Sequence, residues 1–390
     1  MRVKRWASLA LAGGTAAALV AVPTSAGAAG AQTLTVGVGG DSQISGIGFE
    51  GMRFDAPPLQ VHKGDTITFE FRGFHTATLL PDDVSAGDWR AQHMAPGGDY
   101  ALIQPDADDT PSAFEFNKTA ILPSDPTCGA PTAACTYDGS SVVNSGLPIQ
   151  AQSFTVTIND TAGKTFWVIC LLHGMMQQRI TVVPDGQPTT TQSAIDSYAK
   201  TTMARDRDEA AALIPKLEKR TSHTTSSGVK VWDAYGGFDG DGWGLDAMFP
   251  GTLRIHKGDR VRWHFAQLMG NIHTVTFPER AAGNFSNLDF AGQNIKCEAD
   301  PTDTPPDAPP PTFCSTGIQN LEFELRAQAI VPVGSHRYAG KGLFSSGVKG
   351  AEVGNTTPWT LRFVHRSGKH GFHYACNVHG TMMSGRVIVS

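Results

Sequence analysis

Two short segments, one in each half of the chain, place a thiol, an imidazole and thioethers close together. They are residues 170–176 (CLLHGMM) and residues 376–383 (CNVHGTMM). Another histidine lies far upstream of each segment, His75 in Phe-His-Thr and His273 in Ile-His-Thr. Two His, one Cys and a weak axial Met form a blue-copper site, which exchanges one electron with little rearrangement. The sequence therefore predicts two mononuclear copper sites whose chemistry is electron transfer.

The type of ligand favours copper over zinc. Thiolate and thioether sulfur stabilise Cu(I), whereas imidazole also accommodates Cu(II). Zinc prefers a tetrahedral ligand set without a thioether. Because the same residues recur in the same order, the pattern is stronger evidence than a single copy.

The strands that would position these ligands are also repeated. Residues 59–71 align without gaps on residues 253–265, and in both copies a Lys-Gly-Asp turn separates two segments of alternating polarity. Such alternation is typical of half-buried strands. Further strands are expected at residues 153–158, 165–169, 179–183, 359–364 and 386–389. We expect an all-β protein made of two Greek-key sandwiches, residues 32–187 and 228–390.

The composition changes between the two predicted sandwiches. From Ile195 to Leu217, apolar residues recur at helical spacing among charged residues. Ser193 could cap this helix, and Pro215 should kink or end it. We expect residues 188–227 to form an α-helical connector that packs against one or both sandwiches.

The N-terminal segment indicates export. Residues 1–31 begin with Arg2, Lys4 and Arg5, continue with an apolar stretch and end in small residues, as a cleavable secretory signal does. No second long apolar run follows, so we expect no membrane span in the mature chain and a secreted location or one at the exterior of the cell envelope. The net charge of −5 argues against nucleic acid and is compatible with a basic redox partner protein.

Six cysteines are present, and copper would use two of them. The other four form a near pair in each half, Cys128 with Cys135 and Cys297 with Cys314. In an oxidising compartment these pairs are predicted to form two disulfides that staple loops.

Both halves resemble cupredoxins, the family of plastocyanin, amicyanin and azurin. The resemblance covers most of the mature chain apart from the connector and a long insertion between the upstream histidine and the cysteine of each half. The Cys-x2-His-x2-Met spacing of the first half is close to the amicyanin loop. The resemblance implies two type 1 copper ions with these ligands: His75, Cys170, His173 and Met176 in the first site, and His273, Cys376 and His379 in the second.

The axial ligand of the second site has two candidates. Counting from Cys376 as in the first half selects Met382. The segment from Met383 to Val387 better matches the family's Met-x-Gly-Lys-Val return into the last strand, so we favour Met383.

Two details around the ligands also bear on function. Thr76 and Thr274 stand where the best-known cupredoxins place an asparagine that braces the loop, and a threonine hydroxyl can supply a similar bond. The resemblance further implies that the edge of His173 is exposed, in which case residues 171–175 would form an apolar docking patch. The alternative is that Leu171 and Leu172 pack inward.

We expect an electron carrier rather than an enzyme. Multicopper oxidases place histidines on both sides of the cysteine, whereas Cys170 and Cys376 have none there, and the chain contains no His-x-His pair. An oxidase or reductase would therefore need an oligomer to assemble its catalytic copper. Copper storage or delivery is the other alternative, because the same ligands could bind the metal without cycling.

Overall fold

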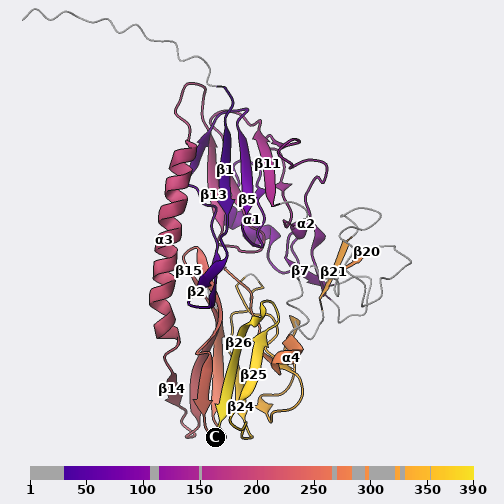
Figure 1. Ribbon diagram of the computed structural model, residues 1–390. Coiled ribbons are helices and arrows are strands. Elements are labelled where there is room, and N and C mark those ends of the chain that lie inside the picture. Colours follow the sequence, from indigo (N-terminus) through magenta and orange to yellow (C-terminus); the bar gives the residue numbers. More distant parts are fainter. Residues whose placement is uncertain are drawn as a thin grey trace, which may run out of the picture.

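The computed structural model describes residues 30–105, 114–148, 152–265, 270–282, 295–297, 321–325, 330–351 and 353–390. Its architecture is mostly β: two halves lie end to end, and one long helix, α3 (Gln192–Leu217), runs beside both (Figure 1). The predicted signal falls almost wholly outside the described residues. Among the residues that are described, no helix is long and apolar enough to cross a membrane.

The first half is a sandwich of two sheets, with strand orders β1-β5-β11-β9 and β10-β6-β12-β13-β4. Side chains such as Phe69 and Phe166, both fully buried, fill the space between the sheets. The strands of this half are β1 (Thr33–Val38), β4 (Leu59–Val61), β5 (Thr66–Phe71), β6 (Thr78–Leu79), β9 (Cys135–Tyr137), β10 (Val143–Asn144), β11 (Ser153–Ile158), β12 (Thr165–Ile169) and β13 (Gln177–Val182).

The second half repeats this plan around a core that includes Trp263 and Phe277. β1 runs parallel to β5 and β13 parallel to β4, just as β15 runs parallel to β18 and β26 to β17. The predicted repeat is therefore present in the fold. The strands of this half are β15 (Lys230–Gly240), β16 (Trp243–Phe249), β17 (Thr252–Ile255), β18 (Arg260–Phe265), β19 (Thr276–Phe277), β22 (Arg337–Tyr338), β23 (Phe344–Ser345), β24 (Trp359–Phe363), β25 (Phe372–Cys376) and β26 (Gly380–Val389).

One of the sandwich sheets crosses the boundary between the halves. The hairpin β2 (Ser42–Ile44) and β3 (Ile47–Gly51) belongs to the first half by sequence, but β3 pairs antiparallel with β16 of the second. Directly paired residues share a face of a sheet. Phe49 opposite Leu245 therefore lies on one face, and Glu50 opposite Gly244 lies on the other.

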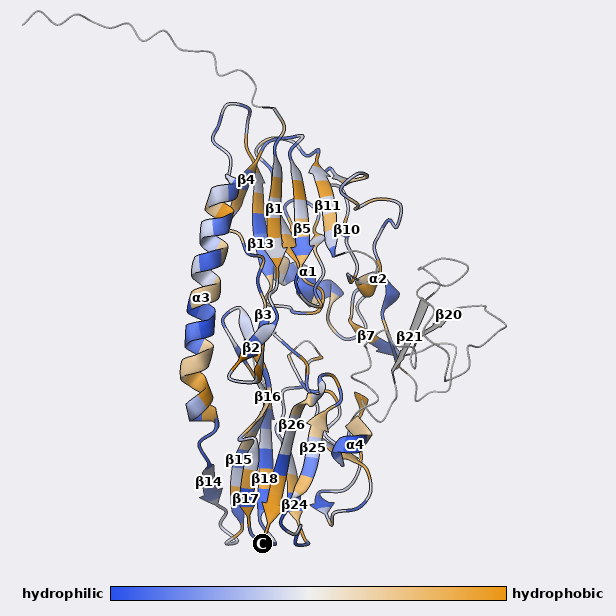
Figure 2. Ribbon diagram, in the orientation of Figure 1, coloured by the Kyte–Doolittle hydropathy of each residue, from blue (hydrophilic) through white to orange (hydrophobic). Residues whose placement is uncertain are grey.

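Helix α3 packs against both halves. Ile195 joins the core of the first sandwich, while Ala210 and Leu217 pack against a cluster that includes Phe49 and Trp243. Figure 2 shows both hydrophobic and hydrophilic residues along this helix, and its buried side chains include Ile195, Ala210 and Leu217.

The ends of the connector differ from expectation. Thr191, not Ser193, caps α3 by accepting the N–H of Ala194, and the helix continues through Pro215 for two more residues. Pro215 lies in the last turn, where little helix remains to be disrupted. Residues 221–224 of the predicted connector form β14 (Thr221–Thr224), which pairs with β15.

The long insertions of the two halves meet in a small sheet of order β20-β21-β8-β7. Cys128 and Cys135 form the first predicted disulfide. Cys314 lies outside the described residues, so the second disulfide stays a prediction. The elements of these insertions are α1 (Ala86–His93), β7 (Ile103–Pro105), β8 (Phe114–Phe116), α2 (Lys118–Ile121), α4 (Glu279–Ala282), β20 (Ile295–Cys297) and β21 (Leu321–Leu325).

Candidate metal centres

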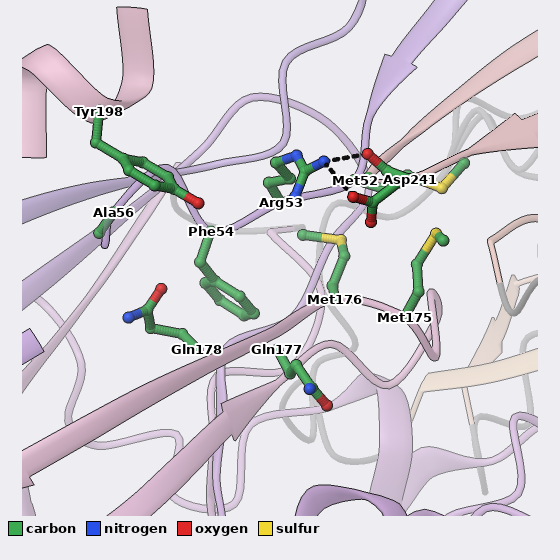
Figure 3. Close-up of a pocket in the computed structure, with 11 residues that line it drawn as sticks. Met52, Arg53, Phe54, Ala56, Met175, Met176, Gln177, Gln178, Tyr198 and Asp241 are labelled. Atoms are coloured by element: carbon green, nitrogen blue, oxygen red, sulfur yellow. Dashed lines mark hydrogen bonds and ion pairs between the residues drawn. The ribbon is translucent and has the colours of Figure 1, made fainter. Parts of the chain in front are cut away.

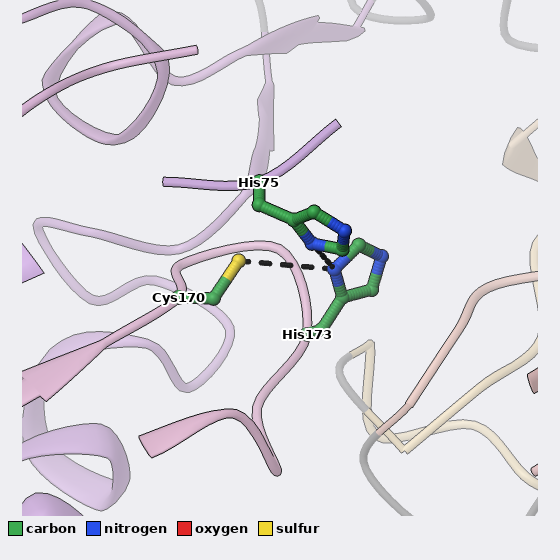
Figure 4. Close-up of side chains that lie close together, drawn as sticks. All are labelled: His75, Cys170 and His173. Atoms are coloured by element: carbon green, nitrogen blue, oxygen red, sulfur yellow. Dashed lines mark hydrogen bonds between the residues drawn. The ribbon is translucent and has the colours of Figure 1, made fainter. Parts of the chain in front are cut away.

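The structure brings three of the predicted ligands of the first site together. Cys170 follows β12, His173 lies in the loop before β13, and His75 lies in the loop between β5 and β6. The Nδ1 atoms of the two histidines are 2.9 Å apart, and Cys170 Sγ is 3.7 Å from His173 Nδ1 (Figure 4). Met176 is buried in the same core cluster as Cys170. The nitrogen and sulfur donors therefore converge on one point, as a mononuclear site requires.

The second half repeats this arrangement. His273 Nδ1 lies 3.2 Å from His379 Nδ1, and Cys376 Sγ lies 3.5 Å from the same His379 atom. In both clusters the ligand atoms lie within 4.8 Å of one another. Met383 is fully buried beside Cys376, whereas Met382 is 84% exposed. The placement favours Met383 over Met382 as the axial residue.

The threonines brace both cysteine loops. Thr76 Oγ1 accepts the backbone N–H of Leu171 at 2.9 Å, and Thr274 Oγ1 accepts that of Asn377 at 2.6 Å. Backbone N–H groups also point at each sulfur: Thr76 and Leu172 donate to Cys170 Sγ, both at 3.4 Å. The predicted hydroxyl bond is thus present in both halves, and it fixes the thiolate in place.

The two clusters differ in electrostatics. Burial raises the pKa of the Cys170 thiol and lowers the pKa of His75 to about 3. Burial also acts to raise the pKa of Cys376, but the charge of His379 together with hydrogen bonds from His379 and Thr274 outweighs it and holds that pKa below its ordinary value. Burial opposes a charge on His379 as well, yet Asp246 and Cys376 raise its pKa to about 9. Without metal, the pKa shifts therefore favour neutral side chains in the first cluster and a charged pair of Cys376 and His379 in the second.

The donor set fits copper. Each cluster offers two imidazole nitrogens and one sulfur from a buried cysteine that is not in a disulfide, and a buried thioether lies in the same core. This is the combination expected of a type 1 site. The fit comes from the donors of the chain and would not suit a hard cation such as Mg²⁺, which prefers oxygen ligands.

Carboxylates lie on the outer edges of the loop histidines. His173 Nε2 is 3.3 Å from Glu50 Oε1, and His379 Nε2 is 3.9 Å from Asp246 Oδ1. Sequence reasoning missed both residues because neither carboxylate belongs to the soft-ligand motifs. In the sequence, Glu50 and Asp246 stand out only as single acidic residues in largely apolar segments. That pattern does not predict that β3 pairs with β16, which is what brings the two residues near the histidines.

The expected docking patch is wrong. His173 is only 5% exposed, and Leu171 packs in a cluster with Ile272 and Val348 of the second half. The alternative, that these leucines pack inward, is what the structure shows. The second half covers the patch because the two cysteine loops face one another.

A small pocket adjoins the first cluster on its methionine side. It encloses about 70 Å³ and is lined by residues that include Met52, Met175 and Met176, with Arg53 and Tyr198 at its rim (Figure 3). Arg53 is held there by ion pairs with Asp206 and Asp241 (Figure 3 shows the second). The thioether edge of this cluster thus lies next to an opening, while its histidine edge is covered.

No family model and no curated protein matches the chain. Among solved structures, it is similar to the multicopper oxidase mgLAC, with 12% identity, 85% of this chain and 86% of that chain covered, and a TM-score of 0.16. A copper nitrite reductase from Nitrosomonas europaea shows 12% identity, coverage of 92% and 93%, and a TM-score of 0.17. A blue copper oxidase from Nitrosomonas europaea shows 13% identity, coverage of 85% and 86%, and a TM-score of 0.16.

Likenesses as weak as these carry no inference about activity. The description of the fold rests on the chain's own strands and on its clusters of ligands. Two β-sandwiches with equivalent parallel strand pairs each hold a His-Cys-His cluster at the end facing the other. The chain thus consists of two β-sandwiches with matching strand pairs, each with a cluster of two histidines and one cysteine, as the resemblance to cupredoxins implies.

Proposed function

We propose that this protein is an electron carrier with two type 1 copper sites and that it has no catalytic centre of its own. The single observation that carries the proposal is the duplicated cluster of two imidazoles and one buried thiol, with a buried thioether in the same core. Bound copper would supply a one-electron Cu(I)/Cu(II) couple. We also propose that the protein works after secretion, or at the exterior of the cell envelope, with a protein redox partner.

The residues of the chain suit that role because they are already in place. Cys170 and Cys376 are fully buried, and each sulfur accepts backbone N–H bonds that hold it in one position. Ligands held by the protein change little between oxidation states, and this lowers the cost of each electron exchange. Burial also keeps water away from the ligand atoms.

Copper storage or delivery remains the second candidate function because it would use the same ligands. A delivery site must release its metal, and release is favoured by exposed, mobile ligands. Here His75, Cys170 and Met176 are almost completely buried. This burial favours a permanently bound metal and thus electron transfer.

The test combines copper content with the visible absorption spectrum. The wild-type protein should bind two coppers and show an intense thiolate-to-Cu(II) band, because each cluster has one cysteine. Cys170→Ser and Cys376→Ser should each lose one copper and roughly half of the band. The double variant Cys128→Ser with Cys135→Ser removes two sulfurs that the clusters do not use, so it should keep the full band.

The alternatives give different results. A colourless protein that binds and exchanges Cu(I) would move the conclusion to storage or delivery. A protein that binds no copper would refute both candidate functions.

A further inference from the structure

The two clusters face each other across a layer of buried polar side chains. Glu50 Oε1 lies 3.3 Å from Nε2 of His173, a ligand candidate of the first cluster. The other oxygen of the same carboxylate, Oε2, accepts a hydrogen bond of 2.6 Å from Asn271 Nδ2. Asn271 is two residues before His273 in the chain. One carboxylate and one amide therefore connect the two clusters almost directly.

A second arm starts from the same amide. Asn271 Nδ2 also donates to Asp246 Oδ1 at 3.2 Å, and this oxygen lies 3.9 Å from His379 Nε2. Asn271 thus reaches both histidines of the second cluster, His273 through the backbone and His379 through Asp246. The connection has no large gap, because every step is a covalent bond or a polar contact of at most 3.9 Å.

The polar layer is rigid. Glu50 is 7% exposed and Asn271 is 4% exposed. The side-chain amide of Asn271 is held on both sides, because its Oδ1 accepts the backbone N–H of Ile272 and its Nδ2 donates to Glu50 and Asp246. The backbone N–H of Asn271 donates to Asp239 Oδ2. In the shared sheet Glu50 stands opposite Gly244, and Asp246 stands opposite Gly48. Each carboxylate thus faces a residue without a side chain, which leaves it room to reach toward the histidines.

Packing alone does not explain this layer. A buried carboxylate costs free energy, and apolar side chains of similar size often stabilise an interface at least as well as a buried charged pair. The other face of the same strands shows this, since Phe49, Trp243 and Leu245 pack there against α3. The polar residues occur only on the face that points at the two clusters.

We propose that Glu50 and Asn271 form a bridge through which the two metal centres exchange an electron inside the molecule. The inference rests on the proposed function and extends it. In the exchange, one electron leaves the reduced centre, whose Cu(I) becomes Cu(II), and reduces Cu(II) to Cu(I) at the other. No bond is made or broken and no proton moves. Glu50 and Asn271 act as positioning residues, because each acts through a metal ligand.

The burial of the histidines in the first cluster limits where a redox partner can approach this protein. His75 is fully buried and His173 is only 5% exposed, so an external donor cannot dock directly on the imidazole edge of the first cluster. An electron that enters from outside must arrive on another side, and the bridge then distributes it between the centres.

The experiment measures the intramolecular exchange rate after flash photoreduction of the copper-loaded, oxidised protein. A Met176→Leu background gives the first centre a different absorption band and potential, so that the two centres can be followed separately. In this background Glu50→Ala and Asn271→Ala should slow the exchange about tenfold or more, the scale on which loss of an outer partner of a metal ligand is felt. Both variants should keep two coppers and both absorption bands.

A matched control tests whether loss of any buried carboxylate at the interface has the same effect. Asp206 is buried, and its ion pairs are with Arg53 at 2.7 Å and with Arg205 rather than with a ligand candidate. Asp206→Asn should leave the exchange rate unchanged. Glu50→Gln should also change the potential of the first centre, because the group in contact with His173 Nε2 changes, and a purely structural role would not produce this shift.

The outcomes are separable. Unchanged exchange in both Glu50→Ala and Asn271→Ala, with two coppers bound, would overturn the bridge and leave the electron carrier intact. A wild-type protein without blue copper would overturn both. If one alanine variant takes up fewer than two coppers, the exchange rate of the other alanine variant and the potential of the Glu50→Gln variant decide.

Discussion

At the scale of single residues, the two clusters are held by equivalent contacts. Thr76 and Thr274 each brace the loop after the cysteine, and each cysteine sulfur accepts the N–H of the threonine and of the residue two positions on. The polar partners of the histidines are not equivalent. Glu50 approaches His173 more closely than Asp246 approaches His379. We therefore expect the two centres to differ in potential.

The choice of axial residue gives a prediction with an internal control. Met383→Leu should change the absorption band and potential of the second centre, because the thioether that packs beside Cys376 is lost. Met382→Leu should change neither, since Met382 is 84% exposed. Spectra and redox titrations of the two variants provide the check. A shift in the Met382 variant alone would reverse the assignment.

A buried carboxylate away from the clusters gives a pH dependence. Burial raises the pKa of Asp55 from its ordinary 3.8 to about 7, although Arg72 opposes the shift. The protonated form is favoured in the folded state, so the stabilisation is fully present below pH 3.8 and is lost as the pH rises through about 7. Asp55→Asn should therefore lose less stability than the wild type between pH 5 and pH 8.

Urea unfolding midpoints at the two pH values measure this difference. Asp208→Asn, a change at an exposed carboxylate of α3, should follow the wild type. Equal pH dependence in the wild type and Asp55→Asn would contradict the assignment.

The sequence predicted which histidines and cysteines lie together, but not the side chains between the two clusters. Cys, His and Met in one loop have a distinctive spacing, and the repeat doubled the signal. Glu50 and Asn271 are ordinary polar residues far apart in the chain, and only the pairing of β3 with β16 brings them together. The exposed edge expected for His173 was wrong for the same reason, because its cover comes from the other half.

At the scale of elements, the hairpin β2–β3 and the helix α3 tie the halves together. Phe49 of β3 is 1% exposed, lies near Trp243 of β16, and has the guanidinium of Arg207 from α3 over its ring. One side chain of the first half thus contacts both the second half and the connector. The amphipathic pattern predicted that α3 would pack against a sandwich, but nothing in the sequence showed that the hairpin would complete its binding surface.

The contacts of Phe49 predict a large effect of truncation. Phe49→Ala should lower the free energy of unfolding by about 3–5 kcal/mol, the usual cost of removing a buried aromatic ring. Gln43→Ala changes an exposed side chain of the same hairpin and should cost about 0.5 kcal/mol or less. Urea unfolding followed by fluorescence measures both. Similar small losses in the two variants would show that the hairpin does not anchor the halves.

At the scale of the whole molecule, the two repeated halves share a strand plan but do not contribute equally to the sheets between them. The strand pairings of the two sandwiches match, which the aligned segments predicted. The first half, however, donates a hairpin to a sandwich sheet of the second, whereas among the described residues no strand of the second half joins a sandwich sheet of the first. A repeat in the sequence reports a shared local fold, whereas the relative placement of the halves depends on surface contacts that the repeat does not encode.

The order of synthesis gives the donated hairpin a further consequence. During synthesis β2–β3 is completed long before β16. The edge of β3 that pairs with β16 therefore has no partner strand from its own chain during this time. An edge in that state pairs with any strand that matches it. Two chains made side by side can therefore exchange hairpins, each completing the sheet of the other in an interlocked dimer.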